Sequence, residues 1–342
     1  MRTLIISDLH LGNRAHRDVL RFGAPRARLL EALGAIDRLV LLGDTVELMT
    51  RHPRRSMAIA EPVLREIGQR LGSEREVILV PGNHDAPMVR AWARDRGSRL
   101  EPSDVVNPAA SPALAHVTSW LAPARVSVRY PGVWLDHRVW ATHGHYLDRH
   151  LLPESAFGLP RGRLQRGAGS PARPIDYERA RRRRAGKRSR EGLPARLAAR
   201  PVATLVEAAA ELLRRATMPQ VPILMMNARL APLTAKLTDA QMRHASLRAM
   251  AYVTQRLGVQ AEWVVFGHVH RAGPLNGERW PGGAGEARLL NTGSWLYEPL
   301  LIDRASPPHP YWPGGAVLLE SGHEPRALGL LDALGPQQLH PR

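Results

Sequence analysis

Short clusters of Asp, Asn and His recur along the chain, each after a short apolar segment. They are Asp8-Leu9-His10, Gly43-Asp44, Gly82-Asn83-His84-Asp85, His143-Gly144-His145 and Gly267-His268-Val269-His270. Carboxylate, amide and imidazole groups suit divalent transition metals, whereas calcium prefers an all-oxygen shell. Side chains two residues apart in extended backbone face the same side, so Asp8 and His10 can act together. Because the chain has no cysteine, the pattern predicts a metal site without thiolate ligands.

Seven of these side chains are candidate metal ligands, comprising two carboxylates, one amide and four imidazoles. They are Asp8, His10, Asp44, Asn83, His143, His268 and His270. A carboxylate such as Asp44 can bridge two ions, and two ions about 3.5–4 Å apart can act together in displacement at phosphorus. We therefore expect two divalent transition metals as cofactors, with manganese favoured and iron or zinc as alternatives.

The apolar segments before the clusters have the length and composition of buried strands. These segments cover residues 2–7, 38–42, 76–80, 133–142 and 262–266, and helical spacing occurs at 17–34 and 55–71. The alternation predicts an α/β fold with parallel strands, whose carboxyl ends bring polar side chains to one edge of a sheet. Residues 126–130 and 133–142 are further expected to form a hairpin around Pro131-Gly132.

The pattern changes between residues 146 and 245. Residues 152–200 are rich in Pro, Gly and Arg, whereas residues 203–216 and 239–257 have helical spacing. We therefore expect a core formed by residues 1–145 and 246–342, interrupted at 146–245 by a mostly helical, Arg-rich cap insertion. Because the insertion leaves after one histidine cluster and returns before another, we expect it to flank the site.

The motifs DLH, GD, GNHD, HGH and GHVH, in this order, resemble those of the calcineurin-like metallophosphoesterase superfamily. The resemblance implies a four-layer αββα sandwich. It also implies a dinuclear enzyme that hydrolyses a phosphoester, phosphodiester or pyrophosphate bond by attack of a metal-bridging hydroxide. By the same resemblance, one ion would be held by Asp8, His10, Asp44 and His270. The other would be held by Asp44, Asn83, His143 and His268.

The resemblance also implies roles for residues that do not bind metal. His84 would stabilise the phosphoryl oxygens and protonate the leaving oxygen, and Asp85 would orient His84. His145 is a candidate substrate contact. Glu47, an acidic residue after the GD motif, is expected to fix the loop around Asp44.

Within the superfamily, the opening SDLHLG, the acidic Glu47 and the helical insertion resemble the UDP-2,3-diacylglucosamine pyrophosphatase-like branch. That branch usually has Arg where this chain has His84, and it lacks an arginine-rich tract. The resemblance therefore favours a pyrophosphate- or phosphodiester-cleaving hydrolase over that specific substrate. Residues 291–295, Asn-Thr-Gly-Ser-Trp, resemble the closing segment of the family and are expected to pack beside the site.

The chain is strongly basic, with 48 Lys and Arg residues against 31 Asp and Glu and a formal charge of +17. Residues 161–200 contain 14 basic and three acidic residues, so this tract carries +11 of that charge. Three interpretations stay open. The tract reflects arginine-rich codon usage, steers an anionic phosphoester or pyrophosphate substrate, or binds nucleic acid or an anionic membrane surface. The alternative functions are thus a metal-dependent nuclease and a nucleic-acid- or membrane-binding protein on a vestigial phosphoesterase fold.

The hydrophobic content of 44% and the charged content of 23% are typical of a globular protein. No apolar run approaches the roughly 18 residues that span a bilayer. Residues 1–7 lead directly into Asp8, which favours a strand over a cleaved signal peptide. We therefore expect a cytoplasmic protein, with the arginine-rich tract as a means of peripheral membrane contact.

Overall fold

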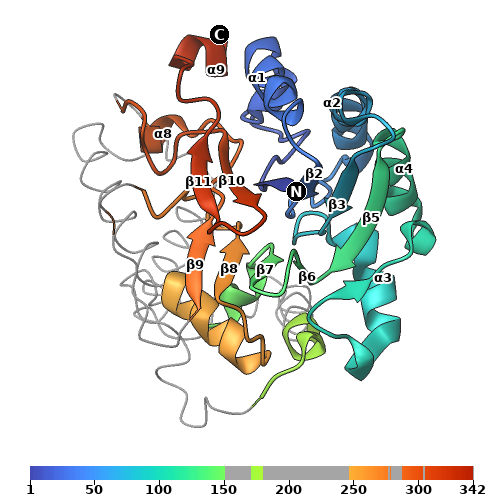
Figure 1. Cartoon of the computed structure of the whole chain (residues 1–342). Coiled ribbons are helices and arrows are strands. Elements are labelled where there is room, and N and C mark those ends of the chain that lie inside the picture. The colour runs from blue at the N-terminus through green and yellow to red at the C-terminus, as the bar shows by residue number, and fades with distance from the viewer. Residues whose placement is uncertain (151–170, 180–245, 276–277, 279–286, 303–304, 342) are drawn as a thin grey trace, which may run out of the picture. The chain divides into compact units, whose positions relative to one another are not determined.

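The computed structural model describes residues 1–150, 171–179, 246–275, 278, 287–302 and 305–341. These residues belong to two compact units, Met1–His145 with Val259–Arg342, and Tyr146–Gly258. The first unit contains both sheets (Figure 1). In the second unit, residues 174–179 and 246–256 are helical. Most of the arginine-rich tract, like most of the predicted insertion, lies outside the described residues.

The larger sheet has seven strands in the order β11-β10-β1-β2-β3-β5-β4. Their bounds are β1 (Arg2–Ile6), β2 (Arg38–Leu41), β3 (Glu76–Leu79), β4 (Asp104–Val105), β5 (Arg125–Tyr130), β10 (Gly315–Glu320) and β11 (Arg326–Gly329). Strands β1, β2, β3 and β5 are parallel, with Ile5 paired to Val40 and Val40 to Ile78. Antiparallel strands complete both edges. The predicted parallel strands at the start of the chain are therefore present.

The smaller sheet has four strands in the order β6-β7-β8-β9. They are β6 (Gly132–Trp134), β7 (Val139–Thr142), β8 (Trp263–Phe266) and β9 (Arg288–Asn291), of which the last three are parallel. The predicted hairpin around Pro131-Gly132 was wrong, because β5 stays in the larger sheet and the hairpin is β6–β7. Pro131 has no backbone N–H to continue a ladder, so the chain leaves one sheet there and enters the other.

Helices pack on the outer face of the larger sheet. The main ones are α1 (Gly23–Leu33), α2 (Pro53–Leu71), α3 (Ala86–Arg96) and α4 (Pro112–Trp120), with short helices α8 (Pro299–Ile302) and α9 (Pro336–Leu339) near the C-terminus. Short 3₁₀ turns lie at Val19–Arg21, Gly97–Arg99, Pro108–Ala110 and His145–Arg149. None of the described helices combines the length and the apolar character needed to span a bilayer.

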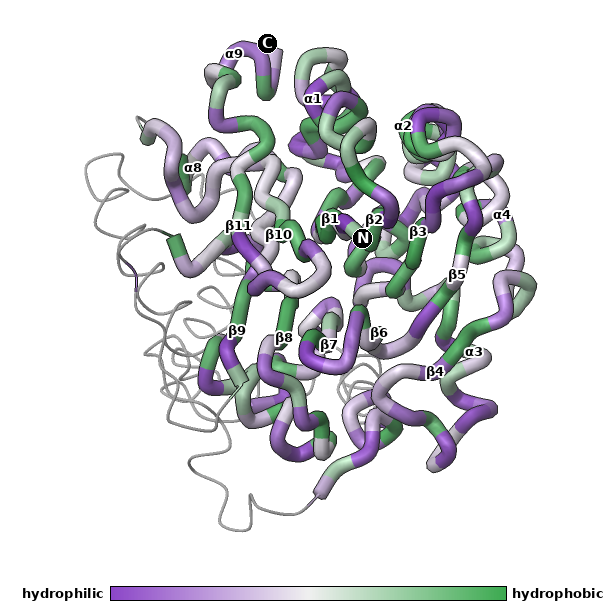
Figure 2. The backbone as a smooth tube through the Cα atoms, viewed as in Figure 1, coloured by the Kyte–Doolittle hydropathy of each residue, from purple (hydrophilic) through white to green (hydrophobic). Residues whose placement is uncertain are grey.

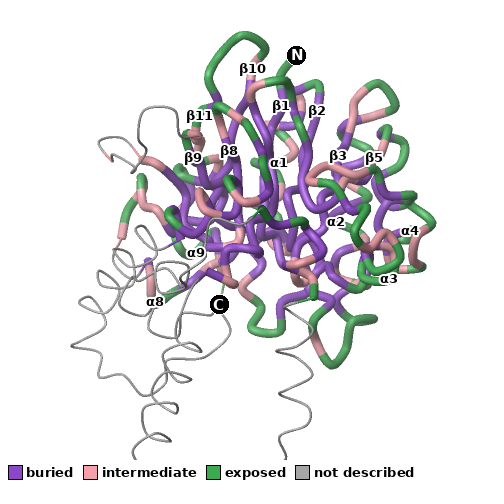
Figure 3. The backbone as a smooth tube through the Cα atoms, turned by 90° about the horizontal axis from the view of Figure 1, so that it is seen from below, coloured by how far each residue is buried: buried purple, intermediate pink, exposed green. Residues whose placement is uncertain are grey.

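Strand alternation divides the apolar residues between two layers of core. Ile6 and Leu41 pack in the layer shared with the helices, whereas Ile5 and Val40 pack in a second layer with Val265 of the smaller sheet. Figure 2 shows hydrophobic residues along β1, β2 and β3, and Figure 3 shows these strands mostly buried. Two sheets that share an apolar layer, with helices outside, confirm the α/β sandwich as the fold class.

Candidate metal centre

The candidate ligands all follow strands of the two sheets. Asp8 and His10 come after β1, Asp44 after β2 and Asn83 after β3, whereas His143 comes after β7 and His268 and His270 after β8. The structure brings these seven residues together in two groups. In one group the ligand atoms of Asp8, His10 and His270 lie within 4.8 Å of one another, and in the other those of Asp44, His143 and His268 do so.

Asp44 lies between the two groups. Its Oδ2 atom is 3.6 Å from His10 Nε2 and 3.3 Å from His143 Nε2. Asn83 extends the second group, because its Oδ1 atom is 3.0 Å from His143 Nε2. In the first group, Asp8 Oδ1 is 3.1 Å from His270 Nε2. A carboxylate placed in this way can face two cations at once.

The ring nitrogens of His143 and His10 face polar atoms of other ligand candidates. His143 Nδ1 donates to Leu42 O (3.1 Å), so Nε2 is the ring nitrogen that faces the Asn83 and Asp44 oxygens. His10 Nδ1 donates to Glu47 (3.1 Å), and its Nε2 lies 3.3 Å from His270 Nε2. Acceptor atoms that converge in this way need a proton or a metal cation between them, and a second N–H held by a carbonyl or carboxylate is typical of metal-binding histidines. The residues therefore fit a pair of divalent cations.

Buried charge dominates the electrostatics of the centre. Burial raises the pKa of Asp8, but His270 and His143 have the larger combined effect and lower it to about 2. Burial also opposes ionisation of Asp44, yet His143 and His84 hold its pKa well below the ordinary value. Burial lowers the pKa of His143, but Asp44 and Asp8 raise it to about 9. The two carboxylates thus stay ionised and favour positive charge between them.

The backbone of the centre is held in an unusual conformation. Five of its residues have positive φ angles without being glycine: Asp8 (55°), His10 (45°), Asp44 (51°), His268 (70°) and His270 (57°). Among the described residues only His16 shares this property. Left-handed backbone in non-glycine residues is uncommon and clusters at functional sites, where the surrounding fold compensates its cost.

Residues 1–165 match the family model of the calcineurin-like phosphoesterases. The match supports the superfamily that the motifs resemble, whose members generally hydrolyse phosphoesters and typically bind divalent metals. It ends before β8, so His268 and His270 are assigned to the centre by their position alone. No curated protein matches the chain.

Glu47, rather than Asp85, orients His84 in the candidate centre. His84 Nδ1 donates to Glu47 Oε1 at 2.6 Å, and Glu47 Oε2 accepts from His10. Burial raises the pKa of Glu47, but these two hydrogen bonds lower it to about 2. The assignment of Asp85 to His84 is therefore corrected. The sequence signal for Glu47 was its place after the GD motif, but its contact with His84 was missed.

Asp85 instead ties two loops of the candidate centre together. Its fully buried carboxylate accepts from the backbone N–H groups of Thr45 (3.0 Å), Val46 (2.9 Å) and Gly82 (3.1 Å). Burial and the nearby Asp44 raise the pKa of Asp85 to about 6. Asp85 thus fixes the loop that carries Asp44 against the loop that carries Asn83.

His84 has an intermediate exposure and lies at the edge of the centre. Burial lowers its pKa, but Asp44 and Glu47 raise it to about 9. His84 also forms a group of ligand-type atoms with His10 and Asp44, in which its Nε2 is 4.0 Å from Asp44 Oδ2. Because Glu47 holds Nδ1, Nε2 is the ring nitrogen that can act on a substrate.

His145 and the Asn-Thr-Gly-Ser-Trp segment lie beside the centre. The His145 ring is buried, with its centroid 5.6 Å from that of His143 and 6.4 Å from that of His268. Trp295 N donates to Asp8 O at 3.1 Å, and the hydroxyls of Thr292 and Ser7 are 2.6 Å apart. The segment therefore supports the turn that carries Asp8, as its position in the sequence suggested.

A glycine allows the centre to be this compact. A Cβ atom at Gly82 would overlap Asp44 Oδ1 and lie 2.6 Å from the Asp44 backbone nitrogen and 2.8 Å from His143 Cδ2. We predict that Gly82→Ala lowers divalent-metal affinity about 10- to 100-fold, the range seen when the support of a metal site is disturbed. Titration with Mn²⁺ would measure it. Gly335→Ala is the fold control for a substituted glycine, since a Cβ there meets nothing within 4 Å and its φ of −79° suits any residue. Equal metal affinities in both variants would contradict the prediction.

Proposed function

We propose that the protein is a dinuclear metal-dependent hydrolase of phosphoester, phosphodiester or pyrophosphate bonds. The observation that carries the proposal is two largely buried groups of His and Asp side chains that meet at Asp44, with the half-buried His84 at their edge. One cation would be held by Asp8, His10, Asp44 and His270. The other would be held by Asp44, Asn83, His143 and His268.

Two such cations supply Lewis acidity at phosphoryl oxygens and a strong nucleophile at neutral pH. The chain's own residues contribute positioning and proton transfer. Glu47 fixes the His10 ring and the His84 ring at the same time, so the metal ligand and the proton donor keep a constant separation. His84 Nε2 can donate to a phosphoryl oxygen or to the leaving oxygen, which stabilises the charge that develops there.

Removing the metals tests the proposal directly. We predict that purified protein contains close to two transition-metal ions per chain. Treatment with a chelator should reduce hydrolysis of bis-p-nitrophenyl phosphate and p-nitrophenyl phosphate to background, and Mn²⁺ should restore it. Elemental analysis and initial rates give the two readouts. Activity that survives at zero metal content would refute the metal-dependent mechanism.

A panel of substrates separates the finer alternatives. It should include the p-nitrophenyl monoester and diester, a UDP-sugar and single-stranded DNA. Preference for the UDP-sugar would support the pyrophosphatase-like branch, and preference for DNA would support a nuclease. Salt-sensitive binding of DNA or anionic vesicles without turnover would instead support a binding protein on a vestigial fold.

A further inference from the structure

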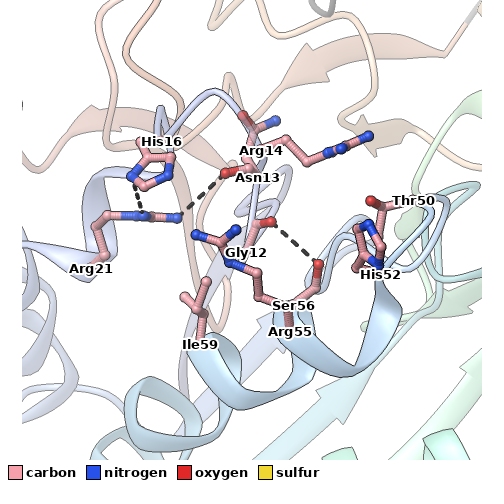
Figure 4. Close-up of a pocket in the computed structure, with 10 residues that line it drawn as sticks. All are labelled: Gly12, Asn13, Arg14, His16, Arg21, Thr50, His52, Arg55, Ser56 and Ile59. Atoms are coloured by element: carbon pink, nitrogen blue, oxygen red, sulfur yellow. Dashed lines mark hydrogen bonds between the residues drawn. The ribbon is translucent and has the colours of Figure 1, made fainter.

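A basic hollow lies between the turn after His10 and the start of α2 (Figure 4). Its volume is about 190 Å³. It is lined by two stretches of chain, which contribute Gly12, Asn13, Arg14, His16 and Arg21 on one side and Thr50, His52, Arg55, Ser56 and Ile59 on the other. Cationic or cation-forming side chains thus approach the same space from both segments.

Two of these cations lack a carboxylate partner. Within the described part of the chain, neither Arg14 nor Arg55 forms an ion pair, and both are exposed. Arg21, in contrast, is paired with Asp18 at 2.6 Å. Arg55 also lies in the first turn of α2, which contains no acidic residue, so its charge adds to the positive end of the helix dipole. The hollow therefore carries positive charge that no carboxylate of the described residues pairs with.

The wall of the hollow also offers hydrogen-bonding groups. Arg21 Nη1 lies 3.0 Å from His16 Nδ1, and because a guanidinium only donates, the neutral His16 ring keeps its proton on Nε2. The Thr50 hydroxyl is shielded from solvent and has no hydrogen-bond partner among the described residues. Buried polar groups are normally paired, so this hydroxyl can donate to a ligand in the hollow after rotation about the Cα–Cβ bond of Thr50.

The hollow adjoins the metal centre through both of its segments. His10 N donates to Asp44 O (2.7 Å), Leu11 N to Thr45 O (3.1 Å) and Glu47 N to Leu11 O (3.0 Å). These bonds hold the two loops side by side, beginning at the ligand candidates His10 and Asp44 and continuing to Leu11 and Glu47. Asn13 N then turns back to His10 O at 2.9 Å. Three residues span at most about 10 Å, so Asn13 in the wall lies within that distance of His10.

We propose that this hollow binds a second phosphate group of the substrate, separate from the phosphoryl group that is cleaved. The inference rests on the proposed function and narrows the substrate class to molecules with two phosphate groups. Arg14 and Arg55 supply charge-assisted hydrogen bonds to the phosphate, for which guanidinium groups have the matching geometry. The His16 ring and the Thr50 hydroxyl complete the set of donors.

The test uses two substrates that differ by one phosphate. They are the p-nitrophenyl ester of thymidine 5′-phosphate and the same compound with an added 3′-phosphate. The measured quantity is the ratio of kcat/KM for the second compound to that for the first. We expect the double variant Arg14→Gln and Arg55→Gln to lower this ratio about 10-fold or more, since hydrogen bonds between charged groups contribute more to binding than neutral ones. Arg54→Gln removes the same charge from the neighbouring exposed position outside the hollow and should keep the wild-type ratio.

A binding measurement separates the subsite from the catalytic proposal. Calorimetric titration of chelator-treated protein with thymidine 3′,5′-bisphosphate should show an affinity that the double variant weakens about 10-fold and Arg54→Gln does not. Equal ratios or equal affinities in the double variant and the wild type would overturn the subsite, as would a wild-type protein that does not bind the bisphosphate. Protein that binds the bisphosphate selectively but hydrolyses neither these esters nor any substrate of the panel above would refute the proposed hydrolase and leave the subsite standing.

Discussion

Asp44→Asn is expected to lower the metal content of the protein below one ion per chain and to reduce phosphoester hydrolysis about 10³-fold or more, since loss of a single electrostatic stabiliser already costs about 10²–10³-fold. Asn keeps the shape of the side chain and removes its charge. Asp44 Oδ2 is the atom that lies near ligand nitrogens of both groups, at 3.6 Å from His10 and 3.3 Å from His143. Elemental analysis and initial rates at saturating Mn²⁺ measure the two effects.

The same substitution isolates the bridging role from a role in folding. Asp44 Oδ1 accepts from His84 N at 2.7 Å, and an amide oxygen can keep that bond. Asp95→Asn removes a carboxylate from an exposed position on α3 and should keep two ions and full activity. If Asp44→Asn retained two ions and wild-type rates, Asp44 would not lie between the metals. If Asp44→Asn affected only the fold, the thermal unfolding midpoint of the variant would fall, but its folded fraction would keep the wild-type metal content.

The strands and the ligand-type clusters were predictable because both depend on short-range pattern. A buried strand appears as an apolar run, and the pleat fixes which side chains share a face, so Asp8 and His10 were identified as a pair. Parallel order then brings the ends of β1, β2 and β3 to one edge. The α/β class followed from the same alternation, whereas the four-layer arrangement came from the resemblance of the motifs. The roles of these side chains as ligands stay a prediction.

Contacts between loops could not be predicted from the sequence. The exchange of roles between Asp85 and Glu47 depends on where two loops meet, because Asp85 follows His84 directly in the chain whereas Glu47 lies 37 positions away. Only the fold shows that the Asp85 oxygens are taken up by three backbone N–H groups, which leaves Glu47 to hold the ring. The basic hollow is similar, because Arg14 and Arg55 lie 41 positions apart in the chain.

The two loops nevertheless share one construction. Each loop follows a parallel strand and carries metal-ligand candidates first and basic residues afterwards. Backbone hydrogen bonds between the two loops hold them side by side. A substrate that spans them would place one phosphate near Asp44 and another near Arg55. Substitutions in the hollow should then change which substrate is preferred, whereas substitutions at the centre should change the rate for all of them.

The second large effect concerns His84. We expect His84→Ala to lower kcat about 10²–10⁴-fold, the contribution typical of a positioned proton donor, while the metal content stays at the wild-type level. The loss should be greater for an alkyl phosphoester than for a p-nitrophenyl ester, because only the poor leaving group needs a proton as it departs. His116→Ala removes an exposed histidine from α4 and should change neither readout.

Glu47→Gln distinguishes a proton donor from a metal ligand at His84. The Glu47 carboxylate holds Nδ1 of both His10 and His84, so its loss should lower activity about 10- to 100-fold through both rings. If His84 is the donor, His84→Ala should keep its metal. Adding Glu47→Gln to His84→Ala should then change the dependence of the rate on the leaving group only a little. If His84→Ala itself releases an ion, the group that it forms with His10 and Asp44 is a true ligand set, and the donor must be sought elsewhere. The leaving-group comparison decides between the two because a ligand affects all esters alike, whereas an acid matters only where the departing oxygen is basic.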